Sequence, residues 1–242
     1  MKLTAFWRWW AAGTTSGLGS AIGAVALPLT ALTVLDASAF EMGLISAASY
    51  LAYLVISLPA GVIVRRLPLR GIQVGADLVR AVAVTSLPLA WWAGLLSVAQ
   101  LIVVALVMSF ANVLFAVANQ TFLPEIVPAQ QLQARNSLNS GTHAVTELGG
   151  PSLGGLAVQV LGAVPTLLVD AVSYVVSAVL LRSLPARQVP APDARASMLA
   201  QIREGWHFVT RHRVMAPGLW AATAVNFVNG AYHALFAFYL VR

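Results

Sequence analysis

Five ionisable side chains lie inside long apolar stretches of this chain, where their chemistry could be used. His143 and Glu147 are four residues apart, so on a helix they would share one face and could share a proton. Asp77 and Arg80 are three apart, a spacing that suits an ion pair within one helix. Asp170 stands apart from both pairs. An ionised group inside a membrane costs several kcal/mol unless it is paired, protonated or in contact with water, so each is a candidate for transport or coupling.

These residues favour different roles. Glu147 lies near the middle of its apolar stretch, which suits a coupling carboxylate, or a neutral carboxyl hydrogen-bonded to a neighbouring helix. His143 could share that proton or form a hydrogen bond across helices. Asp170 falls near the start of its expected helix, where the macrodipole favours a structural carboxylate. For Asp77 we expect the internal ion pair, with Arg65 as the alternative partner.

Polar stripes mark two of the expected helices. One stripe holds Asn112 and Asn119, and the other holds Asn226, Asn229 and His233. Polar stripes on lipid-embedded helices generally face a cavity or the protein interior. Since an Asn side chain can either line a cavity or join two helices, both interpretations stay open.

The composition excludes a soluble enzyme. Of 242 residues, 59% are hydrophobic and 9% are charged, and the mean hydropathy is +0.81, whereas about a quarter of the residues in a soluble domain are charged. The chain has no cysteine, no His/Asp/Glu spacing typical of a metal site, no phosphate-binding glycine loop and no Gly-x-Ser-x-Gly. We therefore expect no metal, no cofactor and no enzymatic activity.

Long uncharged stretches predict an all-α polytopic membrane protein. About 20 apolar residues cross a ~30 Å hydrocarbon core, and the longest uncharged stretch, Ala81–Pro124, suffices for most of two passes. No β-sheet is expected. The expected membrane helices are Trp10–Leu35, Phe40–Val64, Ile72–Trp92, Val98–Val117, Asn136–Val160, Pro165–Leu184 and Pro217–Val241.

Basic residues gather in alternate connections between these helices. They are Lys2, Arg8, Arg65, Arg66, Arg70, Arg135, Arg182, Arg187, Arg195, Arg203, Arg211 and Arg213. The other three loops carry none, so the positive-inside rule places the N-terminus in the cytoplasm. The pI near 10.5 therefore reflects membrane topology, and no nucleic-acid partner is expected.

The connection between the sixth and seventh expected helices, residues 185–215, has two parts. Pro185–Ala196 is rich in proline, alanine and charge, which predicts a flexible connector. Met198–Met215 mixes apolar and basic positions in a pattern typical of an amphipathic helix on the inner membrane surface. A second segment of this kind, Phe122–Leu138, is expected between the fourth and fifth helices.

Glycines recur at four-residue spacing, in the pairs Gly13 and Gly17, Gly19 and Gly23, and Gly150 and Gly154. Such pairs let helices approach closely where lipid supplies no hydrophobic drive, so helix packing is the interpretation for the first two pairs. The third pair lies in Gly150-Pro151-Ser152-Leu153-Gly154-Gly155, where the proline removes a backbone hydrogen bond and kinks the helix. We expect the first helix to pack on the fifth through the first and third pairs.

The string at residues 150–155 resembles the fifth-helix signature of exporters in the major facilitator superfamily. Residues 19–29 and 123–138 are similar to the first helix and the fourth-to-fifth connection of the branch that contains the enterobactin exporter and macrolide-efflux pumps. The loop signature differs from the family pattern. It reads Gly61-Val62-Ile63-Val64-Arg65-Arg66 with Arg70 following, so that Arg65 stands where the family has Asp.

The resemblance implies an exporter of a small amphipathic organic compound, such as a drug, macrolide or siderophore, driven by proton antiport in the inner or plasma membrane. Its partners would be the lipid bilayer, the substrate and protons. The resemblance implies a transporter built of two six-helix halves around a central cavity. The chain would supply residues 1–184 as the first half, the linker 185–215, and residues 216–242 as the first helix of the second half.

Two other classes are alternatives. A chain without most of the second half would be a truncated, non-transporting protein or a membrane assembly partner, and its own partner would be the missing C-terminal half. A seven-helix receptor or light-driven pump fits the number of expected helices. That class requires the opposite orientation, however, and Lys2 is the only lysine, so no late helix could hold retinal.

Overall fold

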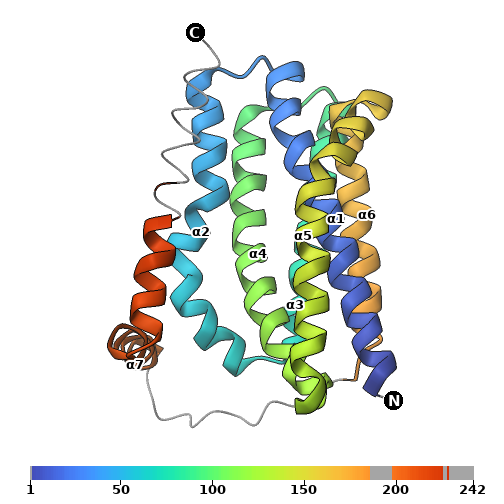
Figure 1. The fold of residues 1–242 in the computed structure, drawn as a ribbon. Helices are drawn as coiled ribbons and strands as arrows, with labels where there is room; N and C mark the ends of the chain where they lie inside the picture. The colour runs from blue at the N-terminus through green and yellow to red at the C-terminus, as the bar shows by residue number, and fades with distance from the viewer. Residues whose placement is uncertain (1, 186–197, 226–227, 229–242) are drawn as a thin grey trace. The chain divides into compact units, whose positions relative to one another are not determined.

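The computed structural model describes residues 2–185, 198–225 and 228, and all of the secondary structure in these ranges is helical. The helices are α1 (Lys2–Val34), α2 (Ala39–Arg66), α3 (Leu69–Trp92), α4 (Val98–Ile126), α5 (Ala129–Leu161), α6 (Ala163–Arg182) and α7 (Met198–Arg211), followed by a short helix at Met215–Val225 (Figure 1). The expected all-α polytopic membrane fold is confirmed.

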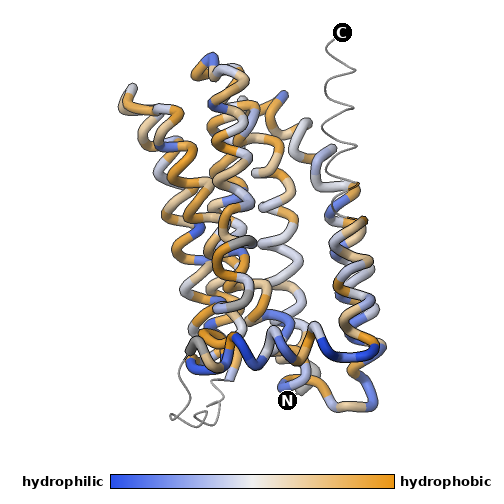
Figure 2. The backbone as a smooth tube through the Cα atoms, turned by 90° about the vertical axis from the view of Figure 1, so that its left-hand side faces the viewer, coloured by the Kyte–Doolittle hydropathy of each residue, from blue (hydrophilic) through white to orange (hydrophobic). Residues whose placement is uncertain are grey.

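Five of these helices are long and apolar enough to cross a membrane: α1, α2, α3, α4 and α6. Apolar residues cover most of their length in Figure 2. The helix α5 has 33 residues, as many as α1, but its composition is too polar for it to be counted with them. Glutamines, asparagines, Arg135 and Glu147 lie along its first two thirds. That polarity suits a helix with one face on a wet cavity rather than one surrounded by lipid.

The breaks between the helices follow from local capping. Ser38 begins α2 with a capping box, because its hydroxyl accepts from the Glu41 N–H at 3.3 Å while the Glu41 carboxylate accepts from the Ser38 N–H at 2.8 Å. Ser97 caps α4 with its hydroxyl alone, which accepts from the N–H of Gln100 at 3.3 Å. Gly94 adopts a φ of 69° between α3 and α4. Ala81–Pro124 is therefore two helices, as predicted.

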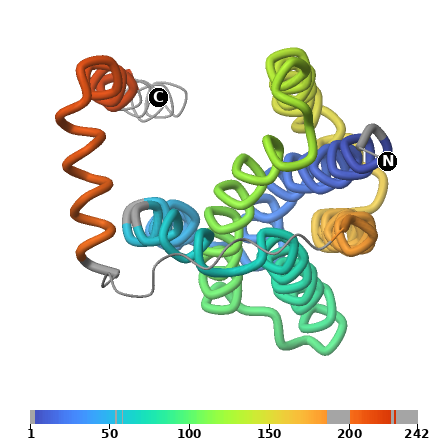
Figure 3. The backbone as a smooth tube through the Cα atoms, turned by 90° about the horizontal axis from the view of Figure 1, so that it is seen from below, coloured from blue at the N-terminus to red at the C-terminus, as the bar shows by residue number. Residues whose placement is uncertain are grey.

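One compact unit covers residues 1–192 and contains α1–α6. Within it α1 packs on α5 and α6, α3 packs on α4 and α6, and α2 packs on α4, whereas α4 and α5 barely touch. Seen from below, α1 lies between α5 and α6 (Figure 3). The side of the unit between α4 and α5 is thus left open.

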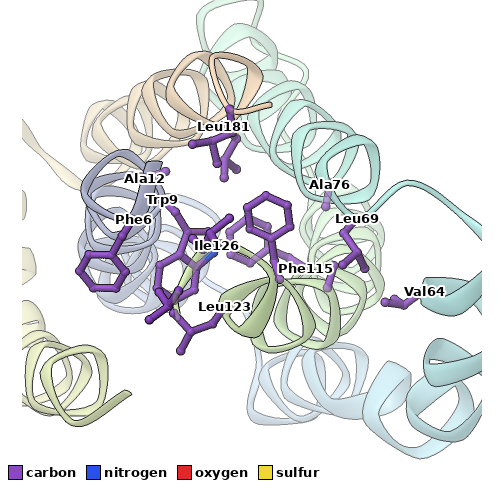
Figure 4. Packing of buried hydrophobic residues seen from close by; sticks show 14 of the residues in the cluster. Phe6, Trp9, Ala12, Val64, Leu69, Ala76, Phe115, Leu123, Ile126 and Leu181 are labelled. Atoms are coloured by element: carbon purple, nitrogen blue, oxygen red, sulfur yellow. The ribbon is translucent and has the colours of Figure 1, made fainter. Parts of the chain in front are cut away.

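Two hydrophobic clusters occupy the two ends of this unit. The Trp9 cluster joins the starts of α1 and α3 to the C-terminal parts of α2, α4 and α6. It includes Phe6, Trp9, Val64, Leu69, Phe115, Leu123, Ile126 and Leu181 (Figure 4). The Leu87 cluster lies at the opposite end and includes Ala26, Ile45, Leu87, Leu101, Leu167 and Tyr174. Buried polar residues lie at the depth between them, including Asp77 and Arg80 of α3.

The expected amphipathic segment Phe122–Leu138 is wrong. The helix α4 continues to Ile126, and α5 begins at Ala129 after the single break at Val127 and Pro128. Phe122, Leu123 and Ile126 are buried in the Trp9 cluster instead of lying on a membrane surface. Their apolar period therefore reflects packing against the bundle.

Residues 193–242 form a second unit, which is described by itself. The expected helix Met198–Met215 ends at Arg211, and a new helix starts at Met215. At this break His212 caps the second helix, because its Nδ1 accepts from the N–H groups of Val214 and Met215, both at 3.3 Å. Most of the expected connector Pro185–Ala196 and the stripe residues Asn226, Asn229 and His233 lie outside the described residues.

Candidate functional site

Arg80 of α3 is the centre of a buried polar group between the two hydrophobic clusters. Its side chain is almost fully buried and forms an ion pair with Asp77 one turn earlier. Its Nη1 donates to Oδ1 of Asn112 on α4 at 2.9 Å. The guanidinium carbon lies 4.3 Å from the ring centroid of Phe115 and 4.5 Å from that of Tyr174 on α6. One cation thereby joins α3, α4 and α6.

The groups around Arg80 offset the free-energy cost of removing its guanidinium group from water. Carboxylate, amide and two aromatic faces replace its water, and cation–π contacts gain strength where water is excluded. The ion pair expected between Asp77 and Arg80 is present. The alternative pairing with Arg65 is wrong, because Arg65 is exposed at the end of α2.

Tyr174 connects the same group to α1. Its hydroxyl lies 2.8 Å from Oγ of Ser20, and that hydroxyl in turn donates to the Ser16 carbonyl at 2.8 Å. Since the Ser20 proton is used in the second bond, the Tyr174 hydroxyl is the donor in the first. The Tyr174 side chain is completely buried, so this bond between α1 and α6 is shielded from water.

Asp170 lies one turn before Tyr174 and is 3% exposed. It is almost two turns into α6, beyond the first turn in which the macrodipole acts, so the structural role expected from that dipole is not supported. Its Oδ1 is buried without a hydrogen-bond partner among the described residues. On α1 the opposing residues are Gly19 and Gly23, and a β-carbon at Gly23 would clash with the carboxylate.

The glycine pairs therefore contact partly different helices from those expected from the sequence. Gly150 and Gly154 do bring α5 against α1, where the closest atoms belong to Ala21 and Ile22. The first pair does not produce the close approach, because Gly13 faces Asn119 of α4 and Gly17 faces Thr146 of α5 only at an ordinary distance. A β-carbon at Gly17 would lie 3.9 Å from its nearest neighbour, which is an ordinary contact. The second pair receives the polar side chains of α6.

A cavity of about 540 Å³ opens between α1, α4 and α5 and reaches Arg80. It contains both residues of the α4 asparagine stripe and the candidate pair of α5. The Nδ1 atom of His143 and the Oε1 atom of Glu147 are 3.6 Å apart, and both side chains are about 70% exposed. The lining residues named by the sequence analysis are Gly13, Gly17, Arg80, Asn112, Asn119, His143, Glu147 and Pro151.

A second cavity, of about 320 Å³, lies nearer the Leu87 cluster. Its wall includes Asp170 and Tyr174 of α6 and Tyr50 of α2. Compared with the first cavity, it is lined by residues further along α1 and nearer the start of α4. It therefore lies closer to the end of the unit that holds the α1–α2 loop. Ser20 and Asn112 line both cavities.

The residues of the loop motif lie at the end of α2 and in the α2–α3 connection. Gly61 lies in α2, and Arg65 and Arg66 end that helix with exposed side chains. Arg70 donates from Nη1 to the Leu184 carbonyl at 2.6 Å and to the Arg182 carbonyl at 3.4 Å. A cation at the C-terminal end of α6 is favoured by the helix dipole, so Arg70 ties the α2–α3 connection to α6.

Sequence reasoning missed three residues of this site: Ser20, Phe115 and Tyr174. Ser20 lies within the first-helix string that resembles the exporter branch, but the roles of all three residues depend on which helices become neighbours. Gly155 has open space around it and lines neither cavity. Within residues 2–185, 198–225 and 228, no group of His, Asp and Glu side chains could hold a metal ion.

The chain is similar to known transport proteins over most of its length. The profile of a family described as transmembrane secretion effector matches residues 1–241. Multidrug efflux pump Tap of Mycolicibacterium fortuitum is 32% identical over 207 residues, 82% of this chain and 50% of that protein. The MFS-type transporter YfiS of Bacillus subtilis is 27% identical over 224 residues, 90% of this chain and 52% of that protein. Tap of Mycobacterium tuberculosis is 26% identical over 206 residues. The chain spans about half the length of these curated relatives.

Proposed function

The chain belongs to the transmembrane secretion effector family of major facilitator efflux transporters, and from this premise we propose that its first cavity is one wall of the path taken by a small amphipathic organic compound. The observation that carries the proposal is the mixed lining of that cavity. The amides of Asn112 and Asn119 line it together with Tyr53 and Phe115. Such a surface contacts both ends of an amphipathic molecule.

Glu147 gives the cavity a preference for cations. Its exposed carboxylate lies on the cavity wall beside the His143 imidazole. Among the described residues, no Lys or Arg side chain forms an ion pair with it. A positively charged substrate and a proton would compete for this carboxylate, which is the exchange that antiport requires. Two of the relatives are described as multidrug efflux pumps, in keeping with a drug-like substrate.

The proposed orientation places the N-terminus in the cytoplasm of a cell with an inner or plasma membrane. Arg70 contacts the end of α6, and the Arg135 guanidinium lies 4.5 Å from the Phe6 ring at the start of α1. The basic residues of these connections therefore gather at one end of α1–α6, and the positive-inside rule assigns that end to the cytoplasm.

The test uses the full-length protein in lipid vesicles with an imposed pH gradient. We expect Glu147→Gln to reduce pH-driven transport of a cationic dye at least tenfold and to spare a neutral dye of similar size. Glu204→Gln, in the exposed helix α7, is the matched control and should leave both unchanged. Unchanged pH-driven transport of the cation by Glu147→Gln would remove Glu147 from the mechanism.

A further inference from the structure

We propose that Asp170 is a second proton-binding site of the transporter, reached from the second cavity, which meets the first beside two hydrogen bonds. The inference rests on the proposed exporter function and deepens it. It adds a second driving proton, bound by a buried carboxylate of α6, to the proton that competes with the substrate at Glu147 of α5.

The charge balance of the interior points to Asp170. Asp77 and Arg80 neutralise each other in their ion pair. Asp170 is then an extra carboxylate, because the described residues give it no ion pair of its own and its Oδ1 has no hydrogen-bond partner. The polar groups that stabilise it are the Tyr174 hydroxyl and Arg80, which is already paired with Asp77. An unpaired buried charge costs several kcal/mol, so the carboxyl is neutral while the site is dry and ionises when water reaches it.

The groups that face Asp170 come from several helices, and none besides Asp77 and Arg80 carries a charge. Opposite it, α1 presents Gly19 and Gly23 without side chains. On α6 the neighbours are the hydroxyls of Ser173 and Tyr174, and across the second cavity are Tyr50 of α2 and Asn112 of α4. His143 and Glu147 line the other cavity. A proton on Asp170 is therefore not shared with the proposed substrate carboxylate.

Two hydrogen bonds lie where the two cavities meet, beside Ala24, which also lines both. Tyr174 donates to Ser20, and Arg80 donates to Asn112, and the two acceptor residues line both cavities. A proton from water in the second cavity can bind a carboxylate oxygen of Asp170 without reaching the first cavity. When the surrounding helices move and admit water from the other side, the same proton is released there, and no other bond is made or broken.

The first experiment reads protonation directly and does not depend on transport. An infrared difference spectrum between acidic and alkaline pH is recorded on the full-length protein in lipid. We expect a band of a protonated buried carboxyl group that shifts when aspartate is labelled with ¹³C and does not shift when glutamate is labelled. The band should be absent in Asp170→Asn and unchanged in Asp36→Asn, a control at an exposed loop position with φ of 49°, which Asn tolerates. A spectrum without an aspartate band, or a band that survives in Asp170→Asn, would overturn the proposal.

The second experiment separates coupling from substrate binding. Asp170→Asn should retain exchange of labelled substrate across vesicles at equal pH, while accumulation driven by a pH gradient should fall at least tenfold. If the wild-type protein itself ignores the gradient, the proposed antiport fails and this inference fails with it. If the wild-type protein responds and Asp170→Asn responds equally, the assignment of Asp170 alone is overturned.

Discussion

Gly23 of α1 lies directly against the carboxylate of Asp170 on α6, at a place where any β-carbon would overlap it. This contact connects the packing of the bundle to its chemistry. A glycine brings two helices close, and the space it leaves is occupied by an acidic side chain that has no counterion of its own. The same feature determines how tightly α1 and α6 can pack and how much room the carboxyl group has.

Gly23→Ala should therefore destabilise the unit. Forcing a methyl group into this contact costs about 1–3 kcal/mol by overpacking. Thermal unfolding in detergent should show a lower Tm for Gly23→Ala than for the wild-type protein. Gly43→Ala is the matched control, because Gly43 lies on a helix with nothing within 4 Å of its added β-carbon. Equal Tm values for the two variants would contradict the tight contact.

The ion pair of Asp77 and Arg80 should behave as one unit. Removing one partner leaves the other charge buried, which costs about 3 kcal/mol or more, whereas removing both leaves no charge behind. Asp77→Asn and Arg80→Gln should each lower the Tm, and the double variant should lose less than the sum of the two. The loss of Arg80 also breaks its bond to Asn112, so Arg80→Gln should be the more damaging single change. Additive losses would contradict a coupled pair.

The crossing of α1 and α5 gives a third prediction. A β-carbon at Gly154 would lie 3.1 Å from the Ile22 carbonyl oxygen, and backbone cannot move aside cheaply. Gly154→Ala should push α5 away from α1 and lower both stability and transport. Gly155→Ala, one residue further along with open space around it, should leave both unchanged. Similar losses in the two variants would show that the loss is not due to this crossing.

The sequence predicts where the helices lie, but it does not predict which helices pack against one another. The long uncharged stretches predict where helices lie, because the length of apolar chain needed to cross a membrane is a local property. Which face of α1 meets which helix is not local. Six residues turn a helix by about 600°, so Gly13 and Gly19 lie on different faces, and the spacing alone cannot say which face meets α5.

The candidate site was predictable to a similar degree. The ion pair of Asp77 and Arg80 and the shared face of His143 and Glu147 depend on spacing within one helix, and both are present. The sequence predicts Asp170 too near the start of its helix, because the expected helix begins at Pro165 whereas α6 begins at Ala163, and the macrodipole acts only within the first turn. The roles of Ser20 and Tyr174 arise only when α1 and α6 pack together, so no pattern along the chain predicts them.

The central claim is that the cavity between α1, α4 and α5 is a wet substrate path. These 242 residues contain no cysteine, so a single cysteine in them gives an unambiguous label. Ala116→Cys places a thiol on α4 at the first cavity, and Val103→Cys places one on the same helix at a position that is 59% exposed and lines no described cavity. The measurement is the rate at which a hydrophilic thiol reagent, which reacts with the ionised thiol in water, modifies each variant in lipid vesicles. We expect the Ala116→Cys thiol to be modified quickly, and a saturating concentration of transported dye to lower its modification rate at least fivefold. The Val103→Cys thiol should react slowly with or without the dye. An Ala116→Cys thiol that reacts no faster than the Val103→Cys thiol, or at a rate unaffected by the dye, would contradict the central claim.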